Sequence, residues 1–122
     1  MTAEILVVDD EPAVRTTLRS MLEHLGHKVA EARDGDEALR ILRQRSFALA
    51  IVDILMPEKD GLEFILHSRR LWPELQTIAI SGAGNEMFLD AARGLGARHV
   101  LQKPFDLQQL TKVITPLLVA SA

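Results

Sequence analysis

The sequence predicts an α/β domain in which helices cover both faces of a doubly wound, five-stranded parallel sheet. Short apolar runs alternate with longer stretches of helical periodicity through the whole chain, without a repeat, a linker or a low-complexity segment. Two of the runs, Ile5–Val8 and Phe47–Val52, are apolar throughout, as expected of strands that are buried on both faces. The helical connections between parallel strands are right-handed crossovers, and such helices pack on both faces of the sheet.

The first unit joins a strand at Ile5–Asp9 to a helix that starts near Pro12. Proline suits the first turn of a helix, because the N–H that it lacks has no helical partner there. Apolar residues then recur with helical spacing as far as Gly26, which ends the helix. The members of this apolar stripe are Val14, Leu18, Met21, Leu22 and Leu25.

The second unit starts with Lys28–Ala32, where polar and apolar residues alternate. Alternation of this kind indicates a strand near the edge of the sheet, where one face is less covered. Asp34 and Glu37 then have the spacing of a capping box, which predicts the start of a second helix. The residues expected to face inward from this helix are Ala38, Ile41 and Leu42.

The third unit holds a lone carboxylate, Asp53, at the carboxyl end of the apolar run Phe47–Val52. The ordinary role of such an aspartate is a helix N-cap, but the next helical pattern begins only near Gly61, which is too far along the chain. A functional role for Asp53 is therefore the better interpretation. The third helix is expected to bury Leu62, Ile65 and Leu66 and to stop before Trp72-Pro73.

The last two units have strands at Thr77–Ser81 and His99–Lys103. The helix between them carries Phe88, Ala91, Ala92 and Leu95 at helical spacing, which predicts that these four residues share a buried face. The final helix runs from about Asp106, and Pro116 is expected to kink or terminate it. Its inward residues are Leu107, Leu110, Val113, Ile114 and Leu117.

For five such units the flavodoxin-like strand order 2-1-3-4-5 is the natural arrangement, and it puts the alternating strands at the edges. Ligands bind such sheets outside the carboxyl ends of the strands, at the point where the strand order reverses. The first and third strands are neighbours at that point, so their terminal carboxylates converge. The polar side chains that end the strands there are Asp9, Asp10, Asp53, Ser81 and Lys103.

Carboxylates gathered in one crevice require a cation or a proton. Two carboxylates about 4 Å apart repel by roughly 4 kcal/mol at an effective dielectric near 20. The three aspartates with Lys103 sum to −2, a charge that one divalent ion cancels. Oxygen ligands with room for water suit Mg²⁺. A metal-neutralised aspartate beside a lysine and a hydroxyl is equipped to accept a phosphoryl group by in-line attack.

Each of these residues also has a simpler interpretation. Asp10 would only cap the first helix, Ser81 would be an ordinary strand-end hydroxyl, and Lys103 would be a surface cation. The simpler readings have to hold at every matched position at once, so the joint functional reading is favoured.

Composition excludes several other functions. A net charge of −3 gives no electrostatic case for binding nucleic acid. The absence of cysteine excludes disulfides, thiolate nucleophiles and zinc-thiolate sites. The start of the chain lacks a signal peptide, and no apolar run is long enough to span a bilayer. A cytoplasmic protein without a membrane partner is therefore expected.

Short motifs stand at the strand ends in a fixed order: Asp9-Asp10, Asp53 with Met56-Pro57 and Asp60-Gly61, Ser81-Gly82 and Lys103-Pro104-Phe105. Together they resemble the full signature of a response-regulator receiver domain. The resemblance covers essentially the whole chain and extends to single-domain, chemotaxis-type regulators.

The resemblance implies that Asp53 is the phosphoacceptor and takes its phosphoryl group from a sensor histidine kinase or a histidine phosphotransfer protein. It implies that Mg²⁺ is held by Asp9, Asp10, Asp53 and the backbone carbonyl of Leu55. Lys103 would pair with the phosphoryl group and Ser81 would hydrogen-bond it. The Lys103-Pro104 bond is expected to be cis, as is frequent in the family.

The resemblance also implies how the chain would act. It would be a switch that phosphorylates and dephosphorylates itself, not a turnover enzyme, and would signal to a downstream protein of unknown identity. It would be a monomer, or a weak dimer through the fourth helix, fifth strand and fifth helix. We expect residues 1–122 to form a single receiver domain without an output domain.

One position departs from the family pattern. Receivers usually carry Tyr or Phe three residues before the lysine, where this chain has Val100. His99 is adjacent but, by strand alternation, points to the opposite face. We therefore hypothesise that signalling relies on movement of the loop after Ser81 and of the fourth helix.

Two other classes of protein remain as alternatives. A small Mg²⁺-dependent phosphohydrolase with an aspartyl-phosphate intermediate commonly has a second acid two residues after its nucleophile, where this chain has Leu55. A flavodoxin-like flavin binder would need a Ser/Thr/Gly phosphate cradle after the first strand, where this chain is acidic.

Overall fold

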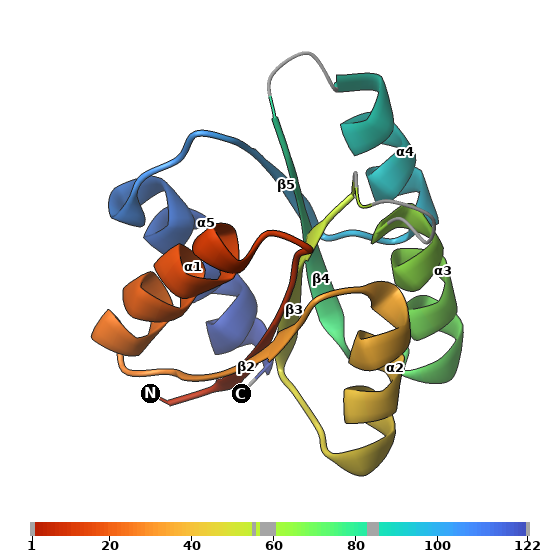
Figure 1. Ribbon diagram of the computed structural model, residues 1–122, viewed down its shortest axis with the longest axis horizontal. Helices are drawn as coiled ribbons and strands as arrows, with labels where there is room; N and C mark the ends of the chain where they lie inside the picture. Colours follow the sequence, from red (N-terminus) through yellow and green to blue (C-terminus); the bar gives the residue numbers. More distant parts are fainter. Residues whose placement is uncertain (1, 55, 57–60, 83–85, 122) are drawn as a thin grey trace.

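The computed structural model describes residues 2–54, 56, 61–82 and 86–121 of the chain (Figure 1). All strand pairs are parallel, and the order is β2-β1-β3-β4-β5. The strands are β1 (Glu4–Val8), β2 (Lys28–Ala32), β3 (Leu49–Asp53), β4 (Gln76–Ser81) and β5 (His99–Gln102). The helices are α1 (Pro12–His24), α2 (Gly35–Gln44), α3 (Gly61–Leu71), α4 (Glu86–Leu95) and α5 (Leu107–Ser121). The predicted fold class and strand order are confirmed.

The sheet is covered on both faces: α1 and α5 lie on one side, and α2, α3 and α4 on the other (Figure 1). Alternate residues of the central strands divide between two cores. Ile5 and Ile51 pack toward α1 and α5, whereas Leu6 and Val52 pack toward the other three helices. This division explains why the apolar runs in β1 and β3 are continuous rather than alternating.

The helix starts follow their local sequence. Glu11 is the N-cap of α1 and makes no side-chain capping bond, with Pro12 directly after it. Asp34 caps α2, because its carboxylate accepts a hydrogen bond from the Glu37 N–H at 2.8 Å. The Glu37 carboxylate in turn accepts from the N–H of Arg33, one residue before the position that a strict capping box uses.

Two predicted helix faces need correction. In α3 the buried side chains are Phe64, Ile65 and Ser68, so Ile65 was correctly predicted, but Leu62 and Leu66 are only half-buried. In α4, Ala92 is buried, whereas Ala91 is exposed and Phe88 is 43% exposed. The reason is that α4 lies over β4 and β5 at the end of the sheet, with α3 as its helical neighbour, so the side of the helix that carries Phe88 and Ala91 remains open to solvent.

Pro116 does not terminate α5, which continues to Ser121. The residues after the proline, Leu117 and Leu118, are both buried in the core beside α1. Their packing offsets the helical hydrogen bond that a proline removes. The alternative that Pro116 ends the helix is therefore wrong.

Candidate functional site

The carboxyl ends of β1 and β3 bring two buried aspartates together. The strands are paired with Val8 opposite Val52, and an aspartate follows each valine. Asp9 is fully buried and Asp53 is almost so. Since both stand at the same edge of a parallel sheet, their carboxylates share one site, as predicted.

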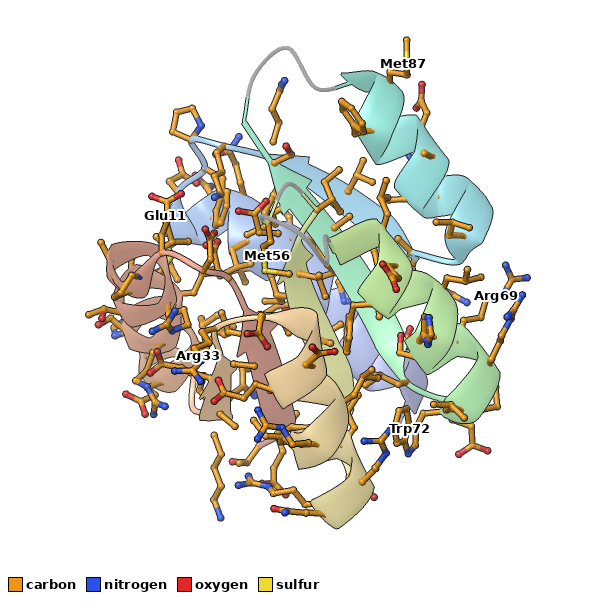
Figure 2. The ribbon with its side chains drawn as sticks, turned by 45° about the vertical axis from the view of Figure 1, so that its right-hand side comes forward. Glu11, Arg33, Met56, Arg69, Trp72 and Met87 are labelled. Carbon is orange, nitrogen blue, oxygen red and sulfur yellow. The ribbon has the colours of Figure 1, made fainter. Side chains whose placement is uncertain are left out.

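An acidic cluster surrounds this pair. Carboxylate oxygens of Asp9, Asp10, Glu11 and Asp53 all lie within 4.8 Å of one another. Asp10 and Glu11 are exposed, so the cluster opens to solvent on one side. Glu11 was not among the predicted ligands, although its place in the unbroken acidic run Asp9-Asp10-Glu11 could have indicated that it belongs to the cluster. It stands beside the start of α1 (Figure 2).

Lys103 reaches this cluster from the end of β5, the edge strand next to β4. Its Nζ lies 3.3 Å from Asp53 Oδ2 and 3.4 Å from Asp9 Oδ2. Lys103 directly follows β5, so its side chain extends past the end of β4 to reach β3 and β1. The surface-cation interpretation of Lys103 is therefore wrong, because its ammonium is held between two buried carboxylates.

Burial and charge change the acidity of these groups. Burial raises the pKa of Asp9 to about 6, and the charge of Asp53 adds to this rise, while the Glu11 N–H and Lys103 oppose it. Burial alone would lower the pKa of Lys103, but the charges of Asp53 and Asp9 outweigh it and leave the pKa raised. The ammonium therefore stays charged at neutral pH.

The turn that carries the cluster is fixed by hydrogen bonds. The Asp9 N–H donates to the Ala32 carbonyl at 3.0 Å, and Asp9 Oδ1 accepts from the Glu11 N–H at 2.9 Å. Asp10 has no capping role in α1, whose N-cap is Glu11. The helix-capping interpretation of Asp10 therefore finds no support.

The remaining predicted site residues stand as follows. Ser81 is buried and ends β4, one residue beyond the residue that pairs with Asp53. Its carbonyl accepts from the Lys103 N–H at 2.6 Å, and the Lys103-Pro104 bond is cis as predicted. Leu55 lies outside the described residues. Val100 is half-buried against the core under α2, α3 and α4.

The hard oxygen donors of this cluster fit Mg²⁺. Four carboxylates within reach of one point, two of them open to solvent, offer oxygen ligands and room for water. Asp9 and Asp53 are both buried, so a cation there would offset a repulsion that Lys103 only partly cancels.

A cavity of about 1170 Å³ lies at the opposite edge of the sheet and contains none of the predicted site residues. It is lined by the residues that precede β3 and β4 and by Trp72, whose position is labelled in Figure 2. The chemistry-bearing side chains thus gather at the carboxyl ends of the strands, and this cavity lies at the opposite ends. Across the described part of the chain, no helix is long and apolar enough to cross a membrane.

Comparison with known proteins identifies the family to which the chain belongs. The family model of the response regulator receiver domain matches residues 5–115. The DNA-binding transcriptional regulator NtrC of Azospirillum brasilense is 35% identical over 112 residues, which cover 92% of this chain and 23% of that protein. The response regulator GtcR of Aneurinibacillus migulanus is 37% identical over 108 residues, 87% of this chain and 43% of that protein. The chain therefore spans less than half the length of these curated relatives.

Solved structures agree with this match. The receiver domain of NtrX from Brucella abortus superposes with a TM-score of 0.91 at 34% identity, over 94% of this chain and 98% of that one. The chemotaxis protein CheY4 of Vibrio cholerae gives a TM-score of 0.88 at 27% identity, over 96% of this chain and 99% of that one. The chain belongs to the response regulator receiver domains, the receiving modules of two-component signalling.

Proposed function

We propose that this chain accepts a phosphoryl group on Asp53 and passes the signal on by protein contact. The observation that carries the proposal is the placement of the Lys103 ammonium within 3.4 Å of both Asp9 and Asp53, inside a cluster of four carboxylates. A structural ion pair alone would not need two further acids beside it, because each one adds repulsion.

In the proposed reaction, an Asp53 carboxylate oxygen attacks the phosphorus of a phosphohistidine on a sensor kinase or a histidine phosphotransfer protein. The P–N bond breaks, and the departing imidazole keeps the electron pair and takes a proton from solvent. Lys103 Nζ moves from the aspartate oxygens to the phosphoryl oxygens, and Ser81 Oγ donates a hydrogen bond to them. Each residue offsets negative charge where it develops.

The residues that would hold Mg²⁺ are Asp9, Asp10 and Asp53, with the Leu55 carbonyl as the fourth predicted ligand and Glu11 within reach. When bound, the ion supplies charge neutralisation, so that an anionic carboxylate and an anionic donor can approach. Asp9 and Asp53 are the two buried members of this set, so they are expected to matter most for affinity.

The test is the intact mass of the protein after incubation with Mg²⁺ and either acetyl phosphate or a phosphohistidine-containing transfer protein. Wild type is expected to gain one phosphoryl group from at least one donor. Asp53→Ala is expected to gain none, and chelation of Mg²⁺ with EDTA is expected to abolish the gain. Asp90→Ala is the matched control, because Asp90 is an exposed carboxylate on α4.

Two outcomes would overturn the proposal. One is the absence of any gain from both donors, and the other is an equal gain in Asp53→Ala. Sustained release of phosphate from small phosphoesters would favour the phosphohydrolase alternative instead.

A further inference from the structure

The side chain of Arg15 links the acidic turn, residues 9–11, to β2 at the edge of the sheet. Its Nη1 donates to the backbone carbonyl of Asp9 at 2.7 Å, and its Nε donates to Glu31 Oε1 at 3.0 Å. Arg15 lies on α1 and Glu31 on β2, so one guanidinium joins a helix, a strand and the turn that follows β1. The Arg15 side chain is only 17% exposed.

With this bond, the backbone and side-chain polar groups of Asp9 each have a hydrogen-bond partner. The N–H of Asp9 is held by the Ala32 carbonyl, its carboxylate by the Glu11 N–H, and its carbonyl by Arg15. The Arg15 N–H also donates to the Glu11 carbonyl at 3.2 Å, so Arg15 contacts both ends of the turn. The start of α1 has no side-chain cap that could do this instead.

We infer that Arg15 is a positioning residue, which holds the turn at Asp9–Glu11 in the geometry that a divalent cation requires and is itself oriented by Glu31. The inference rests on the proposed function, because it concerns the same metal site. Like charges in the turn repel one another, so a free turn would spread. A turn that is already ordered loses no further conformational entropy when the cation binds.

Arginine is required for this geometry. Its planar fork directs Nε and Nη1 at two different acceptors at once, whereas a lysine ammonium is a single point of charge. Glu31 stays ionised to orient the fork, since hydrogen bonds from Arg19 and then Arg15 lower the pKa of Glu31. Charge alone would act in the opposite direction, because a cation beside the site opposes the binding of another.

Arg19 provides a matched control on the same helix. Its Nε donates to Glu31 Oε2 at 2.6 Å and its Nη1 to Glu23 at 3.2 Å, and no bond to the acidic turn is found among the described residues. Arg15 and Arg19 therefore share Glu31 as a partner and differ in their contact with Asp9. Replacing either by methionine removes one charge and one bond to Glu31.

The experiment is a calorimetric Mg²⁺ titration of the unphosphorylated protein, as wild type, Arg15→Met, Arg15→Lys, Arg19→Met and Glu31→Gln. Arg15→Met and Arg15→Lys are expected to raise the Mg²⁺ dissociation constant by roughly tenfold, the lower end of the range for groups that orient metal ligands. Arg19→Met is expected to change it less than about twofold, and Glu31→Gln to fall between them. Thermal unfolding of each variant is measured beside the titration, so that lost metal affinity is compared at known stability.

A second measurement separates positioning from general damage. The rate of phosphorylation by acetyl phosphate is followed against Mg²⁺ concentration. Arg15→Met is expected to shift the half-saturating concentration and to leave the plateau rate unchanged, because a saturating ion restores the turn.

The outcomes distinguish this inference from the proposed function. A wild type that binds no Mg²⁺ overturns the proposed function. A wild type that binds Mg²⁺, with Arg15→Met binding equally well or more tightly, overturns the role of Arg15 alone. If Arg15→Met does not fold, Arg15→Lys and Glu31→Gln decide the question, and unchanged affinity in both overturns it.

Discussion

Gly61 packs its backbone against the backbone of Asp53. A Cβ atom on Gly61 would stand 2.7 Å from Ile54 Cα and nearer still to the Asp53 carbonyl oxygen. The neighbours are backbone atoms and cannot rotate away. The first residue of α3 therefore determines how closely this helix approaches the end of β3, where the proposed phosphoacceptor stands.

Gly61→Ala is therefore expected to disturb both stability and site. Overpacking against fixed backbone costs roughly 1–3 kcal/mol of unfolding free energy, and the shift needed to relieve it would displace Asp53. Gly94→Ala is the matched control, because a Cβ there meets nothing within 4 Å. It is expected to be neutral or to stabilise by up to about 1 kcal/mol. Urea unfolding measures both, and equal stabilities of the two variants would contradict the prediction.

Lys103→Met is expected to slow phosphoryl transfer from acetyl phosphate by roughly 100-fold or more, the usual effect of removing one preorganised donor. The variant loses the ammonium that lies beside both buried aspartates. Lys112→Met removes an exposed lysine from α5 and is expected to react like wild type. Initial rates from intact mass at saturating Mg²⁺ measure the effect. A phosphoryl-transfer rate of Lys103→Met within a few-fold of the wild-type rate would contradict this prediction.

The raised pKa of Asp9 predicts an unusual dependence of stability on pH. Its pKa is about 6 in the folded protein and 3.8 in an unfolded chain, so between these values the folded state binds more protons. Stability contributed by this group is therefore present below pH 4 and is lost as the pH rises to about 6. The loss is on the order of 3 kcal/mol.

Asp9→Asn isolates this contribution, because it keeps the shape of the side chain and removes the titration. Urea unfolding in EDTA at intervals from pH 4 to 7 is expected to show wild type losing stability relative to the variant as the pH rises. Added Mg²⁺ is expected to restore wild type, but not the variant, near neutral pH. A difference between the two proteins that is independent of pH would refute the assignment.

The readout of the switch is predicted to pass through α4. Of its described side chains only Ala92 is fully buried, and Met87 is 81% and Phe88 43% exposed. An element with few fully buried side chains costs less free energy to move than one that is embedded in the core. Beryllofluoride, a mimic of the phosphoryl group, is expected to shift amide resonances from Ser81 into α4. Asp53→Ala should show none of these shifts, and shifts confined to the pocket in wild type would rule out this route.

The strand order could be predicted because the burial of a strand determines its pattern of apolar and polar residues. Continuous apolar runs such as Ile5–Val8 belong in the middle of a sheet, and an alternating run such as Lys28–Ala32 belongs at its edge. The proximity of the main candidate site residues was predictable for a related reason. Each stands where a strand ends, and the ends of parallel strands meet, so Asp9, Asp53 and Lys103 were brought together by the topology alone.

Other features depended on contacts that sequence spacing does not encode. Phe88 has the spacing of a buried residue, but the position of α4 at the end of the sheet leaves it exposed. Pro116 breaks isolated helices, yet the core holds the residues that follow it. The bond from Arg15 to Glu31 joins residues 16 positions apart in different elements, and no local pattern predicts such a pair.

Lys103 meets Asp9 across 94 residues of chain and Asp53 across 50. A polypeptide emerging from the ribosome exposes both aspartates long before the lysine has been synthesised. Under the proposed chemistry, such a nascent chain lacks the ammonium that the transfer needs. The ability to accept a phosphoryl group would then arise only after β5 has joined the sheet, so an incompletely synthesised chain would not signal.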